Sequence, residues 1–311
     1  MRARALGLLV GYVADLLLGD PARFHPVAGF GRVAARAETA SYADSRLRGV
    51  AHTTALVGLG LAVGAGAQRT ARHRPLLEAT LVAATTWTVL GGRSLAREAA
   101  AVHELLGADD LPGARSRLTH LVGRDTSGLD ESEVSRAVVE SVAENTADAV
   151  VAPLIWGATA GIPGLLAYRA ANTLDAMVGH HSARYERFGW ASARLDDLLN
   201  LPAARLTGLL GVVASPGRRA EARQVWRRDA AGHPSPNAGI PEAVFAGSLG
   251  IRLGGRNRYA DRPEERARLG DGRAPGSGDI ARAAALARRV GHEAAVVCCV
   301  AALVRRGARG G

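Results

Sequence analysis

The sequence predicts an all-α, polytopic integral membrane protein with roughly four to six transmembrane or membrane-buried helices. Hydrophobic residues make up 48% of the 311 residues, and alternating strand patterns are scarce. Residues 49–68 and 149–168 each run for 20 residues without a formal charge. A bilayer span needs about 20 mainly apolar residues, so both stretches are long enough. The alternative is a large soluble helical protein whose core helices are rich in Ala.

The first expected element is an uncleaved anchor helix at the N-terminus. Arg2 and Arg4 precede the apolar residues 5–14, as in a signal peptide, but Asp15 interrupts the run and no clean cleavage site follows. Residues 76–95 form a third candidate span, and the shorter charge-free stretches 206–217 and 294–304 are either spans or buried helices. Small residues such as Gly60 and Gly64 would let helices approach closely in a membrane.

Polar segments separate these stretches. We expect one polytopic domain over residues 1–311, with extramembrane parts around 93–148, 180–205, 215–240 and 254–290. Residues 93–148 are expected to be largely helical, with a turn at 107–113 and a helix beginning near Asp130, where Glu131 and Glu133 suit its first turn. Residues 215–238 and 254–279 are rich in Gly, Pro and Arg and are expected to form loops.

The composition excludes several classes of protein. The formal net charge is +10, from 39 basic and 29 acidic residues, and every basic residue is Arg. Without Lys, neither a Schiff-base lysine nor a P-loop lysine exists. The two cysteines, Cys298 and Cys299, are adjacent, so a disulfide scaffold is excluded. No nucleic-acid partner is expected, because Arg is spread along the chain and aromatic residues are only 4%.

The densest polar motif starts at Glu140. Glu140, Glu144 and Asp148 follow one another at i, i+4 and i+8, which places them on one face of a helix. Like charges stacked in this way need a compensating cation, and carboxylate oxygens with substrate phosphate are the ligands that Mg²⁺ prefers. The alternative is a solvated helix face paired with Arg136 or other arginines.

Further polar residues extend this site. A second cluster interleaves acids and amides with arginines, whose guanidinium groups suit phosphate: Asn172, Asp175, Arg184, Arg187, Arg194, Asp196, Asp197 and Asn200. A third group follows the first helix, and a fourth begins a late small-residue helix: Asp15, Asp20 and His25, then Asn237 and Glu242. A lone histidine is more often structural than a ligand, and Asn237 and Glu242 could serve only as helix caps.

At these residues the sequence resembles the membrane-bound adenosylcobinamide-phosphate synthases of cobalamin biosynthesis, the CobD/CbiB family. The similarity lies in four blocks that span nearly the whole chain in order: residues 15–27, 122–154, 168–206 and 235–255. The second block includes Val122-Gly-Arg-Asp-Thr126 and Glu140-Ser-Val-Ala-Glu-Asn-Thr-Ala-Asp148. The family often has Lys at the position of Arg169, where Arg preserves the charge.

The resemblance implies an acid–amine ligase. A propionate side chain of adenosylcobyric acid would be joined to (R)-1-aminopropan-2-ol phosphate, giving adenosylcobinamide phosphate, so the corrinoid is a substrate and not a cofactor. ATP and Mg²⁺ are expected as cofactors. The lipid bilayer and other late enzymes of the pathway are expected partners. A multi-pass location in the cell (inner or plasma) membrane is expected, with the active site on the cytoplasmic side.

On this reading each candidate residue has an expected role. Catalysis is assigned to Glu140, Glu144, Asp148, Asn172, Asp175, Asp196 and Asp197. The Mg²⁺ ligands among them are Glu144, Asp148, Asp175 and Asp196. Phosphate binding is assigned to Arg124, Arg184 and Arg194. Other motif residues are Asp15, Asp20, His25, Asn145, Asn237 and Glu242.

Two other functions fit part of the pattern. Asp and Asn pairs on membrane helices also resemble the Mg²⁺–diphosphate sites of intramembrane prenyl transferases, which would require a lipid diphosphate and consume no ATP. A non-catalytic membrane scaffold or regulator would keep the fold and lose the acidic cluster, which here is intact.

Overall fold

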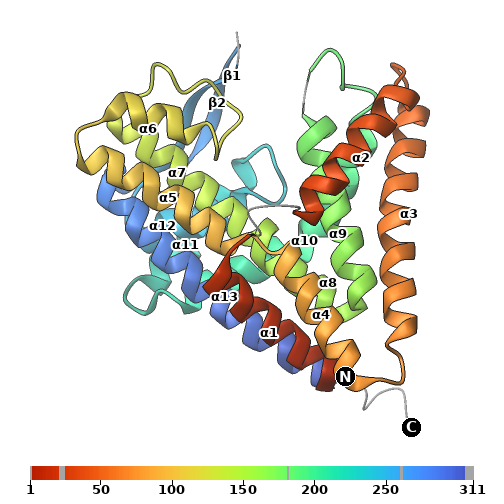
Figure 1. Cartoon of the computed structure of the whole chain (residues 1–311). Coiled ribbons are helices and arrows are strands. Elements are labelled where there is room, and N and C mark those ends of the chain that lie inside the picture. The colour runs from red at the N-terminus through yellow and green to blue at the C-terminus, as the bar shows by residue number, and fades with distance from the viewer. Residues whose placement is uncertain (1, 21–24, 181, 260–261, 305–311) are drawn as a thin grey trace. The chain divides into compact units, whose positions relative to one another are not determined.

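The computed structural model describes residues 2–20, 25–180, 182–259 and 262–304, and these are almost entirely helical (Figure 1). The all-α prediction is confirmed. The chain divides into two compact units: residues 1–91, 148–200 and 295–311 form the first, and residues 92–147 and 201–294 form the second. The chain passes between the units four times, after residues 91, 147, 200 and 294.

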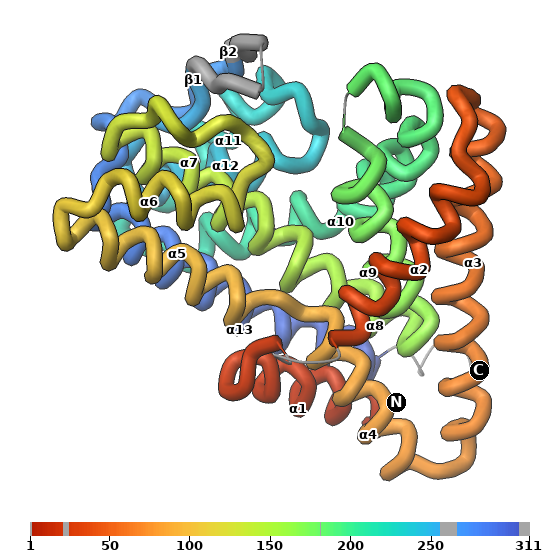
Figure 2. Tube along the Cα trace, turned by 45° about the horizontal axis from the view of Figure 1, so that its top comes forward, coloured from red at the N-terminus to blue at the C-terminus, as the bar shows by residue number. Residues whose placement is uncertain are grey.

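The first unit is formed by long helices and two π-helical turns. Its elements are α1 (Arg2–Leu18), α2 (Pro26–Ser41), α3 (Arg46–Thr70), α4 (Pro75–Val89), η1 (Ala147–Val151), α8 (Ala152–Ala160), α9 (Ile162–Leu174), η2 (Asp175–Gly179) and the beginning of α10 (Trp190–Val213). Helix α1 packs along α4, and α3 packs along α9 (Figures 1 and 2).

Glycines let these helix pairs approach closely. A Cβ on Gly64 of α3 would lie 2.6 Å from Cα of Pro163 in α9, and one on Gly60 would lie 3.1 Å from the carbonyl oxygen of Leu166. On the opposite side of α3, Gly58 and Gly66 have no neighbouring atom within 4 Å. The predicted close approach at small residues is therefore present in α3, at the two glycines that face α9.

The second unit combines helices with one hairpin. Its elements are α5 (Gly92–Gly107), α6 (Leu111–Leu118), α7 (Glu131–Thr146), the end of α10, η3 (Pro216–Arg218), α11 (Arg219–Asp229), η4 (Ala230–Gly232), α12 (Gly239–Leu249), β1 (Leu253–Tyr259), β2 (Arg262–Leu269) and most of α13 (Ser277–Val304). The predicted helix near Asp130 is confirmed, and of the predicted turn at 107–113 only residues 108–110 lie outside helices, because α6 already begins at Leu111. Val212, Ala222 and Val244 join α10, α11 and α12 in one apolar cluster.

Two expected loops are wrong. Within residues 215–238 the structure has the helix α11, whose buried Ala222 and Val225 lie three residues apart on one face. Within residues 254–279 it has the antiparallel pair β1–β2 and the start of α13. The many Arg and Gly residues masked the sequence patterns of the helix and of the hairpin. An amphipathic helix needs only a narrow apolar face, and a hairpin needs few apolar residues.

The predicted set of four to six membrane spans is not confirmed. Helix α3 is the one helix in the described part of the chain that is long and apolar enough to cross a membrane alone. Helix α10 and the segment Pro216–Gly232 pass the same test together, with a 94° bend between them. Residues 149–168 are not a single helix, because the chain breaks at Gly161, where φ is 72°. Residues 76–95 are also divided, between α4 and α5.

Gly64→Ala should destabilise the protein, because its Cβ would meet backbone atoms of Pro163 that cannot move aside. Overpacking of this kind costs about 1–3 kcal/mol. Gly66→Ala, two residues further along α3, is the matched control and should stabilise by up to about 1 kcal/mol, since Ala favours a helix over Gly. The measurement is thermal unfolding of the detergent-solubilised chain by circular dichroism. Equal midpoints for the two variants would contradict this packing.

Candidate functional site

Helix α7 carries two of the predicted acids into the interior of the second unit. It begins with a capping box, in which the Asp130 side chain accepts a hydrogen bond from the Glu133 backbone N–H and the Glu133 carboxylate accepts one from the Asp130 backbone N–H. Beyond this first turn, every residue from Val134 to Ala143 is buried. Of the acids on this face, Glu140 is therefore buried, and Glu144 is partly buried.

Glu140 is held by two guanidinium groups and one backbone amide. Arg124 donates to Oε2 at 3.0 Å, and Arg136 donates to Oε1 at 3.2 Å. The backbone N–H of Gly254, at the start of the hairpin, also donates to Oε1 at 2.9 Å. The Glu140 side chain is only 7% exposed, and that of Arg124 only 4%. Pairing with Arg136, the alternative weighed for this face, is thus present at Glu140, but in a buried setting.

Two further carboxyl groups lie in the electrostatic field of Glu140. Burial is the largest effect on the pKa of Glu144 and raises it. The negative charge of Glu140 raises this pKa further, while the positive charges of Arg266 and Arg124 lower it, all to smaller extents. Burial also holds the pKa of Glu242 well above its ordinary value, and the charges of Glu140 and Glu144 add to this effect. Buried carboxylates that repel one another favour sharing a proton. Glu144 and Glu242 are therefore protonated more readily than ordinary carboxyl groups.

The loop before α12 places a histidine beside Glu242. The backbone N–H of Ser235 donates to Nδ1 of His233 at 3.1 Å. Nε2 lies 3.6 Å from Oε1 of Glu242. The Ser235 hydroxyl accepts from the backbone N–H groups of Asn237 and Ala238, whereas no side chain caps the start of α12. Glu242 is only 1% exposed, and neither carboxylate oxygen has a hydrogen-bond partner among the residues described.

The first unit has a separate cluster centred on Asp196 of α10. Asn172 of α9 donates to Oδ1 of Asp196 at 3.3 Å, and Asn200 donates to Oδ2 at 2.9 Å. The hydroxyl of Tyr168 donates to Oδ1 of Asn200 at 2.8 Å and lies at the same distance from the carbonyl oxygen of Asp148. The predicted residues Asp148, Asn172 and Asp196 are thus brought together by two residues that the prediction did not include among its catalytic groups.

Arg169 supplies the positive charge of this cluster. Its guanidinium donates to Oδ1 of Asn172 at 3.2 Å, and its charge interacts with those of Asp20, Asp148 and Asp196. Nε of Arg169 is buried without a hydrogen-bond partner in the described residues. A guanidinium with an unused donor among carboxylates is suited to an anionic ligand such as phosphate.

Each of the two π-helical turns coincides with one of the predicted carboxylates. Asp148 lies in η1, and Asp175 begins η2. The i→i+5 pattern of η1 does not continue the four-residue register of α7, so the shared face extends from Glu140 to Glu144 and not to Asp148. The Asp175 carboxylate lies directly against Gly179, where any Cβ would collide with it. Single π turns occur frequently at functional sites.

The other candidate residues lie apart from these clusters. Arg184 donates to Glu38 at 2.9 Å and stacks 3.9 Å above the ring of Tyr42. Arg194 lies 3.7 Å from Asp197, and the Arg194 side chain is 67% exposed. His25 caps α2 by accepting from the backbone N–H of Val27, and it lies 3.9 Å from Asp20. Asn145 donates to Ser141, and Asp15 is fully buried in α1.

The donor set fits Mg²⁺ only as the partner of a bound phosphate. Among the described residues, no three His, Cys, Asp or Glu side chains are grouped closely enough to hold a metal by themselves. Mg²⁺ usually keeps several waters and uses one or two carboxylates plus substrate phosphates. Asp196, with its two flanking amides, is compatible with that mode.

Five residues of these clusters were not among the predicted site residues: Arg136, Tyr168, Arg169, Asn200 and His233. Tyr168 and Arg169 come directly after a charge-free stretch and one turn before Asn172. That spacing was available from the sequence. No sequence signal joins His233 to Glu242, since their contact depends on the turn at Ser235.

The fold and these clusters define an all-α protein whose polar residues are gathered into two buried carboxylate groups, one in each unit. The CobD/Cbib protein family model matches residues 8–287. The chain is 49% identical over 308 residues to cobalamin biosynthesis protein CobD of Mycobacterium tuberculosis, covering 98% of both chains. It is 45% identical over 293 residues to the protein of that name in Rhodobacter capsulatus, covering 91% of this chain and 92% of the relative. The chain therefore belongs to the CobD/CbiB family.

A third relative is the cobalamin biosynthesis protein CobD of Geobacter metallireducens, which is 46% identical over 272 residues, covering 85% of this chain and 86% of the relative. No solved structure matches the chain significantly.

Glu140→Gln should destabilise the second unit strongly. The substitution leaves Arg124 and Arg136 buried without their counter-charge, and breaking a buried pair in this way costs about 3–5 kcal/mol. Glu131→Gln, exposed in the first turn of the same helix, is the control and should cost about 0.5 kcal/mol. Chemical unfolding measured side by side checks the difference. A Glu140→Gln variant as stable as the control would show that the ion pairs contribute little.

Glu242 should make stability depend on pH. Its pKa is raised in the folded chain above the ordinary value of 4.5, so the stabilisation from its proton is complete below pH 4.5 and is lost as the pH rises through the raised pKa. Glu242→Gln keeps the group neutral at every pH. The unfolding midpoint of the variant, relative to that of the wild type, should therefore rise as the pH rises. Thermal scans from acid to alkaline pH measure the difference. Glu221→Gln, exposed on α11, should give a flat difference, and a flat difference for Glu242→Gln would refute the raised pKa.

Proposed function

We propose that this protein acts in cobalamin biosynthesis as an ATP-dependent amide ligase. It would join a propionate carboxyl group of adenosylcobyric acid to the amine of (R)-1-aminopropan-2-ol phosphate. The product would be adenosylcobinamide phosphate, released with ADP and inorganic phosphate. The observation that carries the proposal is the similarity to cobalamin biosynthesis proteins along 98% of the chain, with both carboxylate clusters present.

The chemistry requires that a poor acyl donor be activated. A carboxylate resists attack by an amine until one of its oxygens becomes a leaving group, and transfer of a phosphoryl group from ATP achieves this. Mg²⁺, when bound with ATP, would neutralise the charge that develops during this transfer. In the first unit, Asp196 and Asp148, whose charges both act on Arg169, would hold that ion.

Cationic donors would bind the phosphate groups. Arg169 has an unused donor within the Asp196 cluster, and Arg124 also has a buried Nε without a hydrogen-bond partner in the described residues. Arg124 remains paired with Glu140, so its fixed side chain would position a ligand at little conformational cost. Arg184 is already engaged by Glu38 and Tyr42, which makes it the weakest of the three phosphate ligands expected from the sequence.

Amide formation also requires a base. The amino alcohol carries an ammonium group at neutral pH, and this group must lose a proton before its nitrogen can attack. Burial raises the pKa of Glu144, which brings the carboxyl group closer to the range in which it accepts and returns protons.

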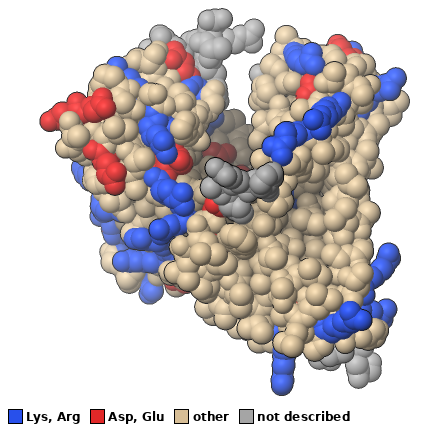
Figure 3. Space-filling model, viewed as in Figure 1, with Lys and Arg blue, Asp and Glu red and all other residues tan. Residues whose placement is uncertain are grey.

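We also propose that the protein is a multi-pass protein of the cell membrane, with its ATP site on the cytoplasmic side. Helix α3 is long and apolar enough to span, and α1 exposes one apolar face, formed by Leu6, Leu9, Val10, Val13 and Leu17. Figure 3 shows a broad uncharged surface where α1 and α4 lie. An apolar face of this extent on a monomer supports contact with lipid.

Ligation should depend on Glu144 and on Asp196. Purified protein is incubated with adenosylcobyric acid, the amino-alcohol phosphate and Mg–ATP, and mass spectrometry detects the amide. Glu144→Gln and Asp196→Asn should each lower turnover by about 100-fold or more, since each removes a charge used in the chemical step. The controls are Glu131→Gln and Asp44→Asn, which alter exposed acids outside both clusters.

Near-wild-type turnover in both variants would contradict these assignments, and absence of the amide with the wild type would contradict the ligase itself. Product formed from a lipid diphosphate without ATP would instead support a prenyl transferase.

A further inference from the structure

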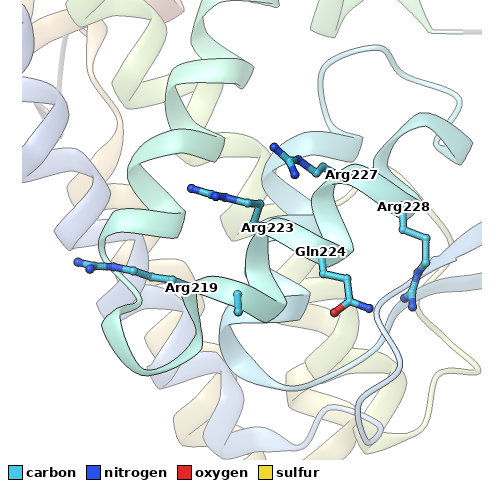
Figure 4. Close-up of a pocket in the computed structure, with 6 residues that line it drawn as sticks. Arg219, Arg223, Gln224, Arg227 and Arg228 are labelled. Carbon is cyan, nitrogen blue, oxygen red and sulfur yellow. The ribbon is translucent and has the colours of Figure 1, made fainter.

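A row of arginines forms a surface pocket on α11. The pocket is lined by Arg219, Ala220, Arg223, Gln224, Arg227 and Arg228. Arg219, Arg223 and Arg227 follow one another at intervals of four residues and extend to the same side of the helix, whereas Gln224 and Arg228 extend to the other side (Figure 4). Residues at this spacing are neighbours on a helix surface, so three positive charges stand in line.

The apolar side of α11 packs on the second unit, and the row of arginines faces away from these packing contacts. Ala222 is fully buried against Val212 and Val244, and Trp226 packs on the same cluster. Helix α11 is thereby fixed to α10 and α12 within the second unit. The arginine side is left exposed, because the opposite side supplies the packing contacts.

Most of this charge is not balanced by the protein. Arg228 is paired with Asp229 and Asp271, and it is therefore occupied. Arg219 donates to the carbonyl oxygen of Val213 at 3.1 Å. Arg223 and Arg227, by contrast, have no hydrogen-bond or ion-pair partner within the part of the chain that the structure describes. Like charges at four-residue spacing destabilise a helix, so this row favours an anionic ligand.

The neighbouring end of α10 indicates what kind of anionic ligand the arginine row would bind. Leu209 and Val213 lie one helical turn apart and are 56% and 51% exposed. The chain then bends by 94° into the segment that contains α11. Exposed apolar side chains followed at once by exposed arginines are typical of the boundary between the hydrocarbon region and the headgroups of a bilayer. A compact soluble anion would need an enclosing site, and a straight row suits a surface.

We propose that Arg219, Arg223 and Arg227 bind the phosphate groups of anionic phospholipids, and so hold α11 at the membrane surface. Clusters of Arg beside apolar segments attract anionic lipids, because each guanidinium gains from the negative potential at the surface. Guanidinium groups also donate paired hydrogen bonds to phosphate oxygens. This inference does not depend on the ligase activity, since none of these arginines belongs to either carboxylate cluster.

The test is lipid binding to the full chain, purified in a neutral detergent and titrated with phosphatidylglycerol or with phosphatidylcholine of the same acyl chains. Native mass spectrometry measures the bound fraction. The wild type should prefer phosphatidylglycerol, and Arg223→Gln/Arg227→Gln should weaken that binding by roughly tenfold, with phosphatidylcholine unaffected. Added salt should weaken binding of the anionic lipid in the wild type.

A matched control removes the same charge from the same unit. Arg252→Gln/Arg268→Gln alters two exposed arginines outside α11 and should bind phosphatidylglycerol like the wild type. Arg223→Lys/Arg227→Lys should retain most of the binding, which separates loss of charge from loss of fold; circular dichroism checks the helix content of each variant. Equal affinity of the Gln variant and the control would overturn the proposal. Displacement of the lipid by an equal concentration of inorganic phosphate would also overturn it, since the site would then take free phosphate.

Discussion

The buried carboxylate of Glu140 organises the second unit. It accepts hydrogen bonds from Arg124, from Arg136 and from the backbone of Gly254. These donors belong to the segment before α7, to α7 itself and to the hairpin that follows α12. Burying a charge lowers the stability of the fold by several kcal/mol unless the charge is paired and hydrogen-bonded. The three elements must therefore keep their positions around the Glu140 carboxylate.

The same arrangement determines the chemistry that the unit can perform. Two arginines already hold Glu140, and the additional acids Glu144 and Glu242 feel its negative charge as well as the positive charges of Arg124 and Arg266. Their raised pKa values follow from burial and from mutual repulsion. In its ionised form, a carboxyl group with a raised pKa is a stronger base toward an ammonium group than an ordinary carboxylate is. The ion pairs that stabilise the fold and the acids that would do chemistry are therefore parts of one electrostatic group.

In the first unit, polar groups are brought together among apolar helices. Amide side chains of Asn172 and Asn200 satisfy both oxygens of Asp196, and Tyr168 connects this cluster to the backbone at Asp148. Helices can converge this closely because small residues face their neighbours, as at Gly60 and Gly64 of α3. The two π turns then place Asp148 and Asp175 off the regular helical register. Close packing and satisfied hydrogen bonds together position this cluster.

The sequence by itself determined the helical class, the start of α7 at Asp130 and the family, because helical periodicity, capping residues and long motifs are local along the chain. It also singled out Glu144 and Asp196 as members of polar clusters. Only the tertiary structure decided that Glu140 is held by Arg124 and Arg136, that His233 faces Glu242, and that Asp148 leaves the face of α7. Those outcomes depend on burial and on contacts between distant segments, and the energy of a charge is set by its surroundings more than by its neighbours in sequence.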